Sequence, residues 1–269
     1  MMDYSKIYDM GAGAFRAYAP AKLNITLEIG ETDSASGLHK ISSIMQAISL
    51  HDTITMRLGT VSRSIEGFVV NDNLVERAMS ALEDKIGRKL PCGIRVDKCI
   101  PIAAGMGGGS SDAAAALRLA NVAFDLGLKI NELEQVARSV GNDISFLLHG
   151  GRAKVEGSLE HRISSIDVPE MYYLIAHPDM ELSTKQMYSL YDKTGSSFTE
   201  LAAGMCADTR RLLDNLRKTN PAECAVTGKG PTVFAGYSSR QQRDGALGSI
   251  AWFSGELFSE HAIGALEHS

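Results

Sequence analysis

The sequence predicts an α+β protein built from two lobes, and three observations support this class. The chain has 269 residues, of which 44% are hydrophobic, so it can form one large domain or two modest lobes with a shared core. Alternating apolar and polar residues, typical of half-buried strands, occur between residues 16 and 58, and an apolar strand pattern returns at residue 171. Segments with the helical spacing of apolar residues lie between and after these strands.

Composition and charge exclude several classes of protein. The net charge of -5 argues against a broad nucleic-acid surface, which needs an excess of basic residues. The sequence contains no run of eighteen apolar residues, so we expect no membrane span. The first ten residues are polar and lack the apolar core of a secretion signal. The four cysteines are scattered without a Cys-x-x-Cys pair. We therefore expect a cytoplasmic protein with reduced cysteines and no zinc site.

The first lobe should comprise residues 1–160. Asn71–Leu82 has its apolar residues on one helical face, and Asn131 is a suitable N-cap for a helix that runs to Ser139. A further helix is expected from Ser111 to Phe124, and strands at Arg16–Ile29, Ile41–Leu50, Thr53–Leu58, Gly93–Ile100 and Ala153–Gly157.

The second lobe should comprise residues 161–269. Ser183 or Thr184 caps a predicted helix that ends near Tyr191. Two more helices are expected at Asp208–Arg217 and Ser239–Leu247, and strands at Met171–Ala176, Ala222–Thr227, Thr232–Tyr237 and Ile250–Phe258.

The segment Pro101–Ala116 is typical of a phosphate-binding loop. Four of its residues within five positions are glycines, which let a ligand approach the backbone N–H groups closely. The alanines of residues 113–116 favour a helix directly behind the glycines, and a helix N-terminus attracts anions. A flexible turn before a core helix would fit the same pattern. The loop has no lysine for a Walker A motif, and the spacing Gly-x-Gly-x-x-Gly fails because Ser110 stands at the third glycine.

The same loop resembles the glycine-serine motif of the galactokinase, homoserine kinase, mevalonate kinase and phosphomevalonate kinase (GHMP) superfamily. Other stretches, in the same order along nearly the whole chain, are also similar to this superfamily, and most of all to its 4-diphosphocytidyl-2-C-methyl-D-erythritol kinases. They are Pro-Ala-Lys-Leu-Asn ending at Asn24, Gly-Leu-His ending at His39, Asp-Asn-Leu around Asn73, Gly-Asn-Asp ending at Asp143, and Gly-Lys-Gly-Pro-Thr from Gly228. The resemblance implies a two-lobed fold with a ribosomal S5 domain 2-like first lobe and a ferredoxin-like second lobe.

The resemblance also implies roles at the phosphate donor. Asp143 would take the proton of the acceptor hydroxyl, and Lys22 would stabilise charge on the transferred phosphoryl group. Without the resemblance, Asp143 also fits a helix N-cap and Lys22 a surface lysine. ATP would be bound by Asn73 and by the loop residues Gly105, Met106, Gly107, Gly108, Gly109, Ser110 and Ser111. Ser111, or else Ser110, would reach Mg²⁺.

The acceptor would be bound by residues from both lobes. They are Asn24, Leu38, His39, Thr184, Tyr188, Gly228, Lys229 and Gly230. Two positions depart from the family pattern. Leu38 replaces a tyrosine that stacks on cytosine in the family, and Lys229 replaces a small hydroxyl residue. If Lys229 points into the site it adds a cation for phosphate; if it points outward it is a solvated lysine.

The implied reaction is the transfer of the γ-phosphoryl group of ATP to the 2-hydroxyl of 4-diphosphocytidyl-2-C-methyl-D-erythritol. Kinases of another small alcohol, such as mevalonate, phosphomevalonate or homoserine, and a non-catalytic nucleotide-binding homologue are the alternatives. We expect a small-molecule substrate, no nucleic-acid or membrane partner, and a monomer or homodimer.

Overall fold

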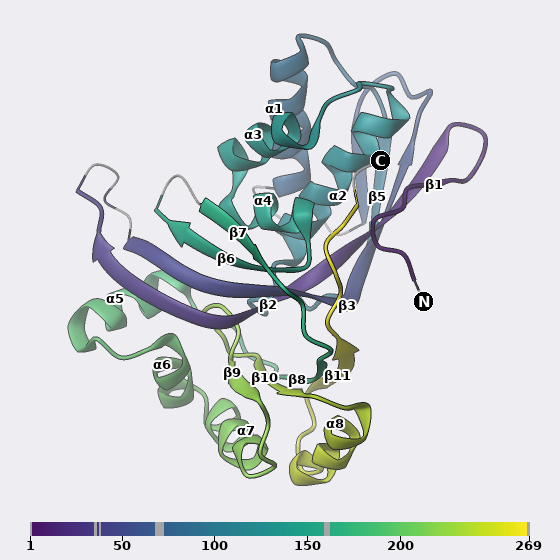
Figure 1. Cartoon of the computed structure of the whole chain (residues 1–269). Coiled ribbons are helices and arrows are strands. Elements are labelled where there is room, and N and C mark those ends of the chain that lie inside the picture. Colours follow the sequence, from purple (N-terminus) through teal and green to yellow (C-terminus); the bar gives the residue numbers. More distant parts are fainter. Residues whose placement is uncertain (1, 35–36, 38, 68–72, 159–161, 268–269) are drawn as a thin grey trace.

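The computed structural model describes residues 2–34, 37, 39–67, 73–158 and 162–267, and its elements form two sheets covered by helices (Figure 1). The predicted α+β class is confirmed. None of the helices in the described ranges is long and apolar enough to cross a membrane.

Two long antiparallel strands, β2 (Ala14–Thr32) and β3 (His39–Arg57), form the centre of the first sheet. The sequence predicts two separate strands, Ile41–Leu50 and Thr53–Leu58, but in the structure both belong to the continuous strand β3. Residues His51 and Asp52 interrupt the apolar pattern, but their pairing with Pro20 and Ala19 keeps the strand continuous. The sheet is completed by β1 (Tyr8–Asp9), β4 (Ser64–Gly67), β5 (Gly93–Asp97), β6 (Arg152–Gly157) and β7 (Arg162–Ile166).

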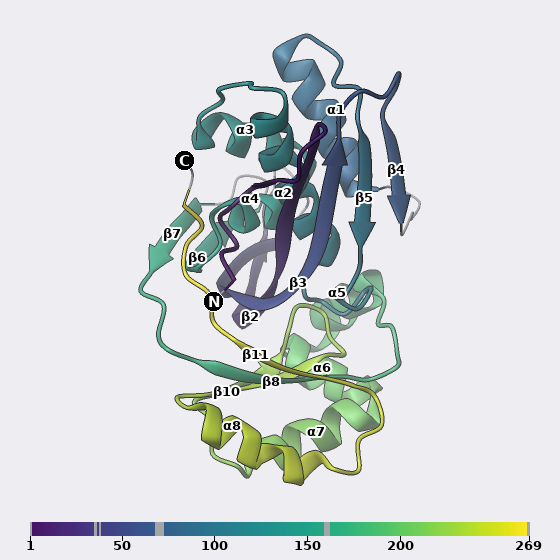
Figure 2. The same ribbon diagram turned by 90° about the vertical axis from the view of Figure 1, so that its right-hand side faces the viewer.

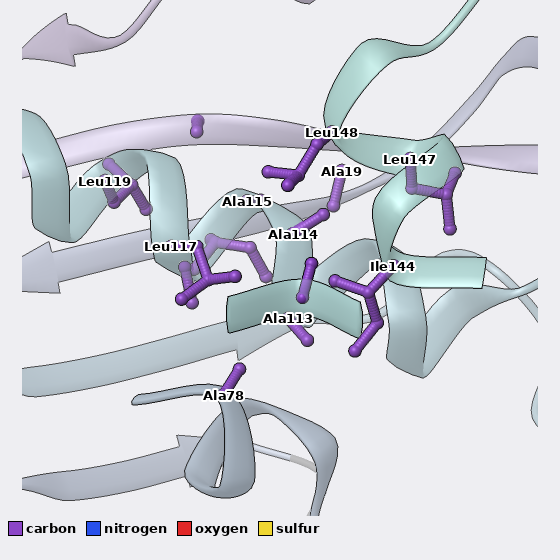
Figure 3. Close-up of a cluster of buried hydrophobic side chains, with 14 of the residues drawn as sticks. Ala19, Ala78, Ala113, Ala114, Ala115, Leu117, Leu119, Ile144, Leu147 and Leu148 are labelled. Atoms are coloured by element: carbon purple, nitrogen blue, oxygen red, sulfur yellow. The ribbon is translucent and has the colours of Figure 1, made fainter. Parts of the chain in front are cut away.

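Helices cover one face of this sheet. They are α1 (Leu74–Ile86), α2 (Gly108–Ala123), α3 (Ile130–Val140) and α4 (Asn142–His149). The alanines at positions 113–116 and Ala120 of α2 are buried, and Figure 3 shows Ala113 and Ala114 close to Ile144 of α4. Because these side chains are small, α2 packs closely against both the sheet and α4, which brings the N-termini of the two helices to the same region.

The second sheet has the order β11-β8-β10-β9 and is antiparallel throughout. It lies between the first lobe and helices α7 and α8 (Figure 2). Its strands are β8 (Tyr172–His177), β9 (Glu223–Val226), β10 (Val233–Tyr237) and β11 (Glu256–His261). The helices of this lobe are α5 (Thr184–Thr194), α6 (Phe198–Met205), α7 (Ala207–Arg217) and α8 (Arg240–Ala246).

Several local predictions differ from the structure. Helix α2 begins at Gly108 rather than Ser111, and α4, β1, β4 and β7 are not among the predicted elements. A short 3-10 helix, Leu247–Ile250, replaces the start of the predicted last strand, which begins only at Glu256. The N-cap of α3 is Lys129 rather than Asn131, and α6 was not predicted. The lobe boundary after residue 160 stays a prediction. It falls between β6 and β7, which pair in the first sheet, and the chain after β11 returns to that lobe through Ala262 and Ala265.

Candidate active site

The side chains of Lys22 and Asn24 project from β2 at a place where the strand is irregular. Shifts in the register with β3 occur between Pro20 and Lys22 and between Asn24 and Thr26. Such bulges change the direction in which strand side chains point. Lys22 is only 4% exposed, and its ammonium donates to Asn24 Oδ1 at 2.5 Å and to the carbonyl oxygen of Gly105 at 3.0 Å. The bulged segment therefore directs a buried cation at the glycine loop.

Asp143 approaches Lys22 from the first turn of α4. Its Oδ2 lies 3.6 Å from Lys22 Nζ, and its side chain is 33% exposed. The helix N-terminus and the nearby ammonium both attract a carboxylate, so this position suits a negative charge. The structure thus brings together the two residues that the sequence predicts as catalytic.

The glycine loop bends sharply before α2 begins. Gly105 and Gly107 have φ angles of +77° and +72°, and Gly107 is the N-cap of α2. A Cβ at Gly107 would lie 3.0 Å from Lys22 Cγ, so only glycine lets the loop approach that lysine so closely. The free N–H groups at the start of α2 can bind phosphate oxygens.

Thr227, which follows β9, joins the loop to the second lobe. Its buried hydroxyl accepts from the Asn24 N–H at 3.1 Å and donates to the carbonyl oxygen of Gly105 at 3.2 Å. A Cβ at Gly105 would overlap the carbonyl oxygen of Thr227, which explains the glycine. In the sequence, Thr227 stands at the end of a predicted strand, where no pattern indicates a role in the site.

Two cavities meet at this place. The first, of about 300 Å³, is lined by the glycine loop together with Asn73 and Lys98. The second, of about 240 Å³, contains Lys22 and Asp143 and is lined further by Asn24, Leu27, Ile41, Met45, Thr184, Tyr188, Phe198, Gly228 and Lys229. Gly105 and Gly107 belong to both cavities. A group bound in one cavity can therefore meet a group bound in the other beside the Lys22–Asp143 pair.

The predicted nucleotide residues line the first cavity, with one exception. Asn73, which caps α1 by accepting from Val75 N–H at 2.9 Å, lies there with residues 105–110. Ser111 does not. Its hydroxyl donates to the carbonyl oxygen of Pro20 at 2.7 Å, and the residue is only 1% exposed. The hydroxyl residue that faces the cavity is Ser110.

Two residues that line this cavity, Lys98 and Asp112, belong to a charged cluster that the sequence pattern does not indicate. Lys98 pairs with Asp52 and, at 2.8 Å, with Asp112 of α2. Burial raises the pKa of Asp112 to about 7; the ammonium of Lys98 opposes this shift and the charge of Asp52 adds to it. Asp52 also accepts from two N–H groups, those of Cys99 and Ile100. The cluster fixes the chain that leads into the glycine loop.

Two aromatic residues, Tyr188 and Phe198, line the second cavity, and His39 contacts Tyr188 without lining the cavity itself. The rings of His39 and Tyr188 stack with centroids 5.5 Å apart, and Phe198 meets Tyr188 edge-on at 5.1 Å. His39 is held at both nitrogens, by the carbonyl oxygen of Gly30 and by Asp192, each at 3.0 Å. Phe198 was missed because α6 was not predicted. Leu38, the predicted substitute for a stacking tyrosine, lies outside the described residues.

The turn after β9 contributes unequally to the second cavity. Gly228 and Lys229 line it, whereas Gly230 is buried and packs against Val226, where a Cβ would lie 2.8 Å from Val226 Cγ1. Gly230 therefore has a packing role in the structure, with no contact to the cavity.

Comparisons with known proteins agree with this site. Residues 73–151 match the family described as the GHMP kinases N terminal domain. The chain is 32% identical over 257 residues to the 4-diphosphocytidyl-2-C-methyl-D-erythritol kinase of Caldicellulosiruptor saccharolyticus, covering 82% of this chain and 88% of that protein. It is 29% identical to the enzyme of the same name from Bacillus licheniformis, covering 91% of this chain and 96% of that one.

Solved structures show the same fold. A crystal structure of 4-(cytidine 5'-diphospho)-2C-methyl-D-erythritol kinase superposes with a TM-score of 0.78 at 20% identity, covering 93% of this chain and 99% of the other. The homoserine kinase of Cytophaga hutchinsonii superposes with a TM-score of 0.67 at 15% identity, covering 97% and 98%.

The fold, the match to the family model and the similarity to named kinases over most of the chain define the class of this protein, which is a GHMP kinase. The predicted two-lobed GHMP fold is confirmed. Proteins of this class are small-molecule kinases, so the chain uses ATP to phosphorylate a small molecule. Within the class, the chain belongs to the family of 4-diphosphocytidyl-2-C-methyl-D-erythritol kinases, as its similarity over most of the length of these relatives shows.

Proposed function

We propose that this protein transfers the γ-phosphoryl group of ATP to the 2-hydroxyl of 4-diphosphocytidyl-2-C-methyl-D-erythritol. The relatives that it matches over most of their length have this kinase name. The observation that supports the chemistry is the Lys22–Asp143 pair at the junction of the two cavities. A phosphoryl transfer needs a donor and an acceptor in line, with a proton acceptor and a cation between them.

The donor binds in the first cavity in this proposal. Its phosphates lie on the N–H groups of the glycine loop and the start of α2, and Asn73 lies beside the nucleoside. The γ-phosphoryl group then points past Gly105 and Gly107 into the second cavity, because these two glycines are shared by both.

Asp143 acts as the base. The acceptor oxygen forms a bond to the γ-phosphorus while the bond from that phosphorus to the bridging oxygen of ADP breaks. The hydroxyl proton moves to the Asp143 carboxylate. Lys22 stabilises the negative charge of the transferred group, and Asn24 and Gly105 hold its ammonium in place.

Mg²⁺ fits the residues of the first cavity. In the described part of the chain, no group of three or more His, Cys, Asp or Glu residues could hold a metal by itself. A kinase site does not need such a group, because Mg²⁺ in these sites is coordinated by one or two protein oxygens together with phosphate oxygens and water. Ser110 and Asp112 line the cavity, and Asp112 Oδ1 is buried with no hydrogen-bond partner among the residues that the structure describes. We propose these two residues as the holders of a Mg²⁺ ion that neutralises phosphate charge.

The acceptor lies in the second cavity. The apolar side chains of Leu27, Ile41 and Met45 suit its carbon chain with the methyl branch, and Thr184 offers a hydroxyl. The aromatic group of His39, Tyr188 and Phe198 suits a planar base.

The variant Asp143→Asn tests this assignment. We expect kcat to fall by about 10²–10⁴-fold, because the amide cannot take the proton. The Kd of ATP, measured by calorimetry, should stay the same because Asp143 lies outside the nucleotide cavity. Asp214→Asn, an exposed change on α7, is the control. If Asp143→Asn binds ATP and keeps full turnover, Asp143 is not the base.

A further inference from the structure

Lys229 occupies a fixed place at the edge of the acceptor cavity. It lies between Gly228 and Gly230, whose φ angles are +56° and +82°. The turn is closed by hydrogen bonds of 3.0 Å from Gly230 N–H to Thr227 O and from Thr227 N–H to Thr232 O. A Cβ at Gly228 would lie 3.1 Å from the carbonyl oxygen of Gly105, so the turn also rests against the glycine loop. The backbone that presents Lys229 is therefore held on both sides.

The side chain of Lys229 faces the cavity. It is among the residues that line it, with Tyr188, Thr184 and Lys22, and its side chain is only 19% exposed. This answers the question that the sequence left open between an inward and an outward lysine. Lys229 does not line the nucleotide cavity; the lysine among the described residues that line that cavity is Lys98.

The charge of Lys229 is weakly compensated. The ion pair that the structure gives it is with Glu181, at 3.9 Å, and the Glu181 side chain is 71% exposed. A long pair to an exposed carboxylate contributes little. Lys22, in contrast, is held by Asn24, by Gly105 and by Asp143. Lys22 and Lys229 are the lysines among the described residues that line this cavity, and of the two it is Lys229 whose charge can meet a ligand.

We propose that Lys229 is a specificity-determining residue that binds the diphosphate group of the acceptor. This inference rests on the function proposed above. The protein has a net charge of -5, so an acceptor with a diphosphate needs a local cation to bind. A lysine is a compact point charge that forms strong hydrogen bonds with phosphate oxygens. Lys229 lines the same cavity as the aromatic residues Tyr188 and Phe198. If the base of the acceptor binds at these aromatic residues, the diphosphate attached to its ribose lies beside Lys229.

Binding of CDP and of cytidine tests the inference without turnover. The two probes share the base and the ribose and differ in the diphosphate. Both are titrated by calorimetry while a non-hydrolysable ATP analogue fills the nucleotide cavity. In Lys229→Gln, the Kd of CDP should rise by about 10- to 100-fold, while the Kd of cytidine stays within about twofold. Lys229→Arg should keep most of the preference for CDP, and Lys185→Gln, an exposed lysine of α5, should change neither Kd.

Several results would overturn the inference. An unchanged Kd for CDP in Lys229→Gln would show that the lysine does not contact the diphosphate. An equal loss for CDP and cytidine would point to a general distortion of the cavity. A weakened Kd for the ATP analogue with CDP binding intact would assign the charge to the donor instead.

Kinetics separate this inference from the proposed function. With wild-type protein turning over the cytidine diphosphate acceptor, Lys229→Gln should raise the KM of that acceptor by a similar factor and leave the KM of ATP unchanged. If wild-type protein does not turn it over, the proposed function fails. If it does, and Lys229→Gln has the wild-type KM, only the role of Lys229 fails.

Discussion

The change Thr227→Val tests how the second lobe holds the two parts of the active site together. Thr227 is fully buried, and valine has nearly its shape but no hydroxyl. Two hydrogen bonds are lost, one from the Asn24 N–H and one to the Gly105 carbonyl oxygen. Gly105 O still accepts from Lys22 Nζ, so the group left without a partner is the Asn24 N–H. An unsatisfied buried donor costs about 1–3 kcal/mol, and we expect the free energy of unfolding to fall by about 2 kcal/mol.

The same change should reduce catalysis. Asn24 belongs to the bulged segment that also directs Lys22, and Gly105 belongs to the glycine loop. Without the shared hydroxyl, the strand and the loop are free to move relative to each other. A displacement of 1 Å at a reacting centre costs about 10²-fold, so kcat should fall by about 10- to 100-fold.

Urea unfolding and steady-state kinetics measure the two effects, and Thr227→Ser is the matched control. Serine keeps the hydroxyl but removes a buried methyl group, which costs about 0.8 kcal/mol of stability. We expect Thr227→Ser to lose stability and keep its kcat. Wild-type kcat in Thr227→Val would refute the argument that this hydroxyl aligns the loop with β2.

Three further predictions concern Lys22, Gly105 and Asp112. Lys22→Met should lower kcat by about 10²–10³-fold with the Kd of ATP nearly unchanged by calorimetry, and a loss below threefold would remove Lys22 from the chemistry. Gly105→Ala should weaken ATP binding at least tenfold because its Cβ overlaps a backbone carbonyl, whereas Gly11→Ala, with a similar φ of +75° in open space, should bind ATP normally. Because the pKa of Asp112 is raised from 3.8 to about 7, the folded state holds a proton that the unfolded state releases, so stability is lost as the pH rises from about 4 to 7. Asp112→Asn removes this loss. The free energy of unfolding of the variant minus that of wild type, both from urea unfolding, should therefore rise by about 2–3 kcal/mol between pH 5 and pH 7.5. A difference that does not depend on pH would contradict the assignment.

The catalytic pair and the glycine loop could be predicted because each depends on short segments with a distinctive pattern. Lys22 follows a proline at a strand entrance, and Asp143 precedes an apolar run. The side of α2 that faces the cavity could not be predicted in the same way. Glycine is a poor helix former, so the sequence favours a helix start at Ser111, but α2 begins at Gly108. The earlier start turns Ser111 toward Pro20 and leaves Ser110 facing the cavity.

Contacts between distant segments were harder to predict. Asp52 lies on β3, Lys98 follows β5 and Asp112 lies on α2. The pairing of β3 with β5 brings Asp52 beside Lys98, and the placement of α2 adds Asp112. The pairing partners Thr53 and Asp97 stand next to Asp52 and Lys98, so the register of the sheet would have shown the Asp52–Lys98 pair. The link from Thr227 to Gly105 crosses between the lobes, and no local pattern indicates it.

The release of ADP with a panel of acceptors tests the central claim most directly. The protein is incubated with ATP, Mg²⁺ and, separately, 4-diphosphocytidyl-2-C-methyl-D-erythritol, mevalonate, phosphomevalonate and homoserine. We predict rapid ADP release with the cytidine compound, abolished in Asp143→Asn, and only background release with the other three. Turnover of another alcohol without turnover of the cytidine compound would contradict the proposed acceptor, and ATP binding without transfer to any of the four would contradict the proposed kinase activity.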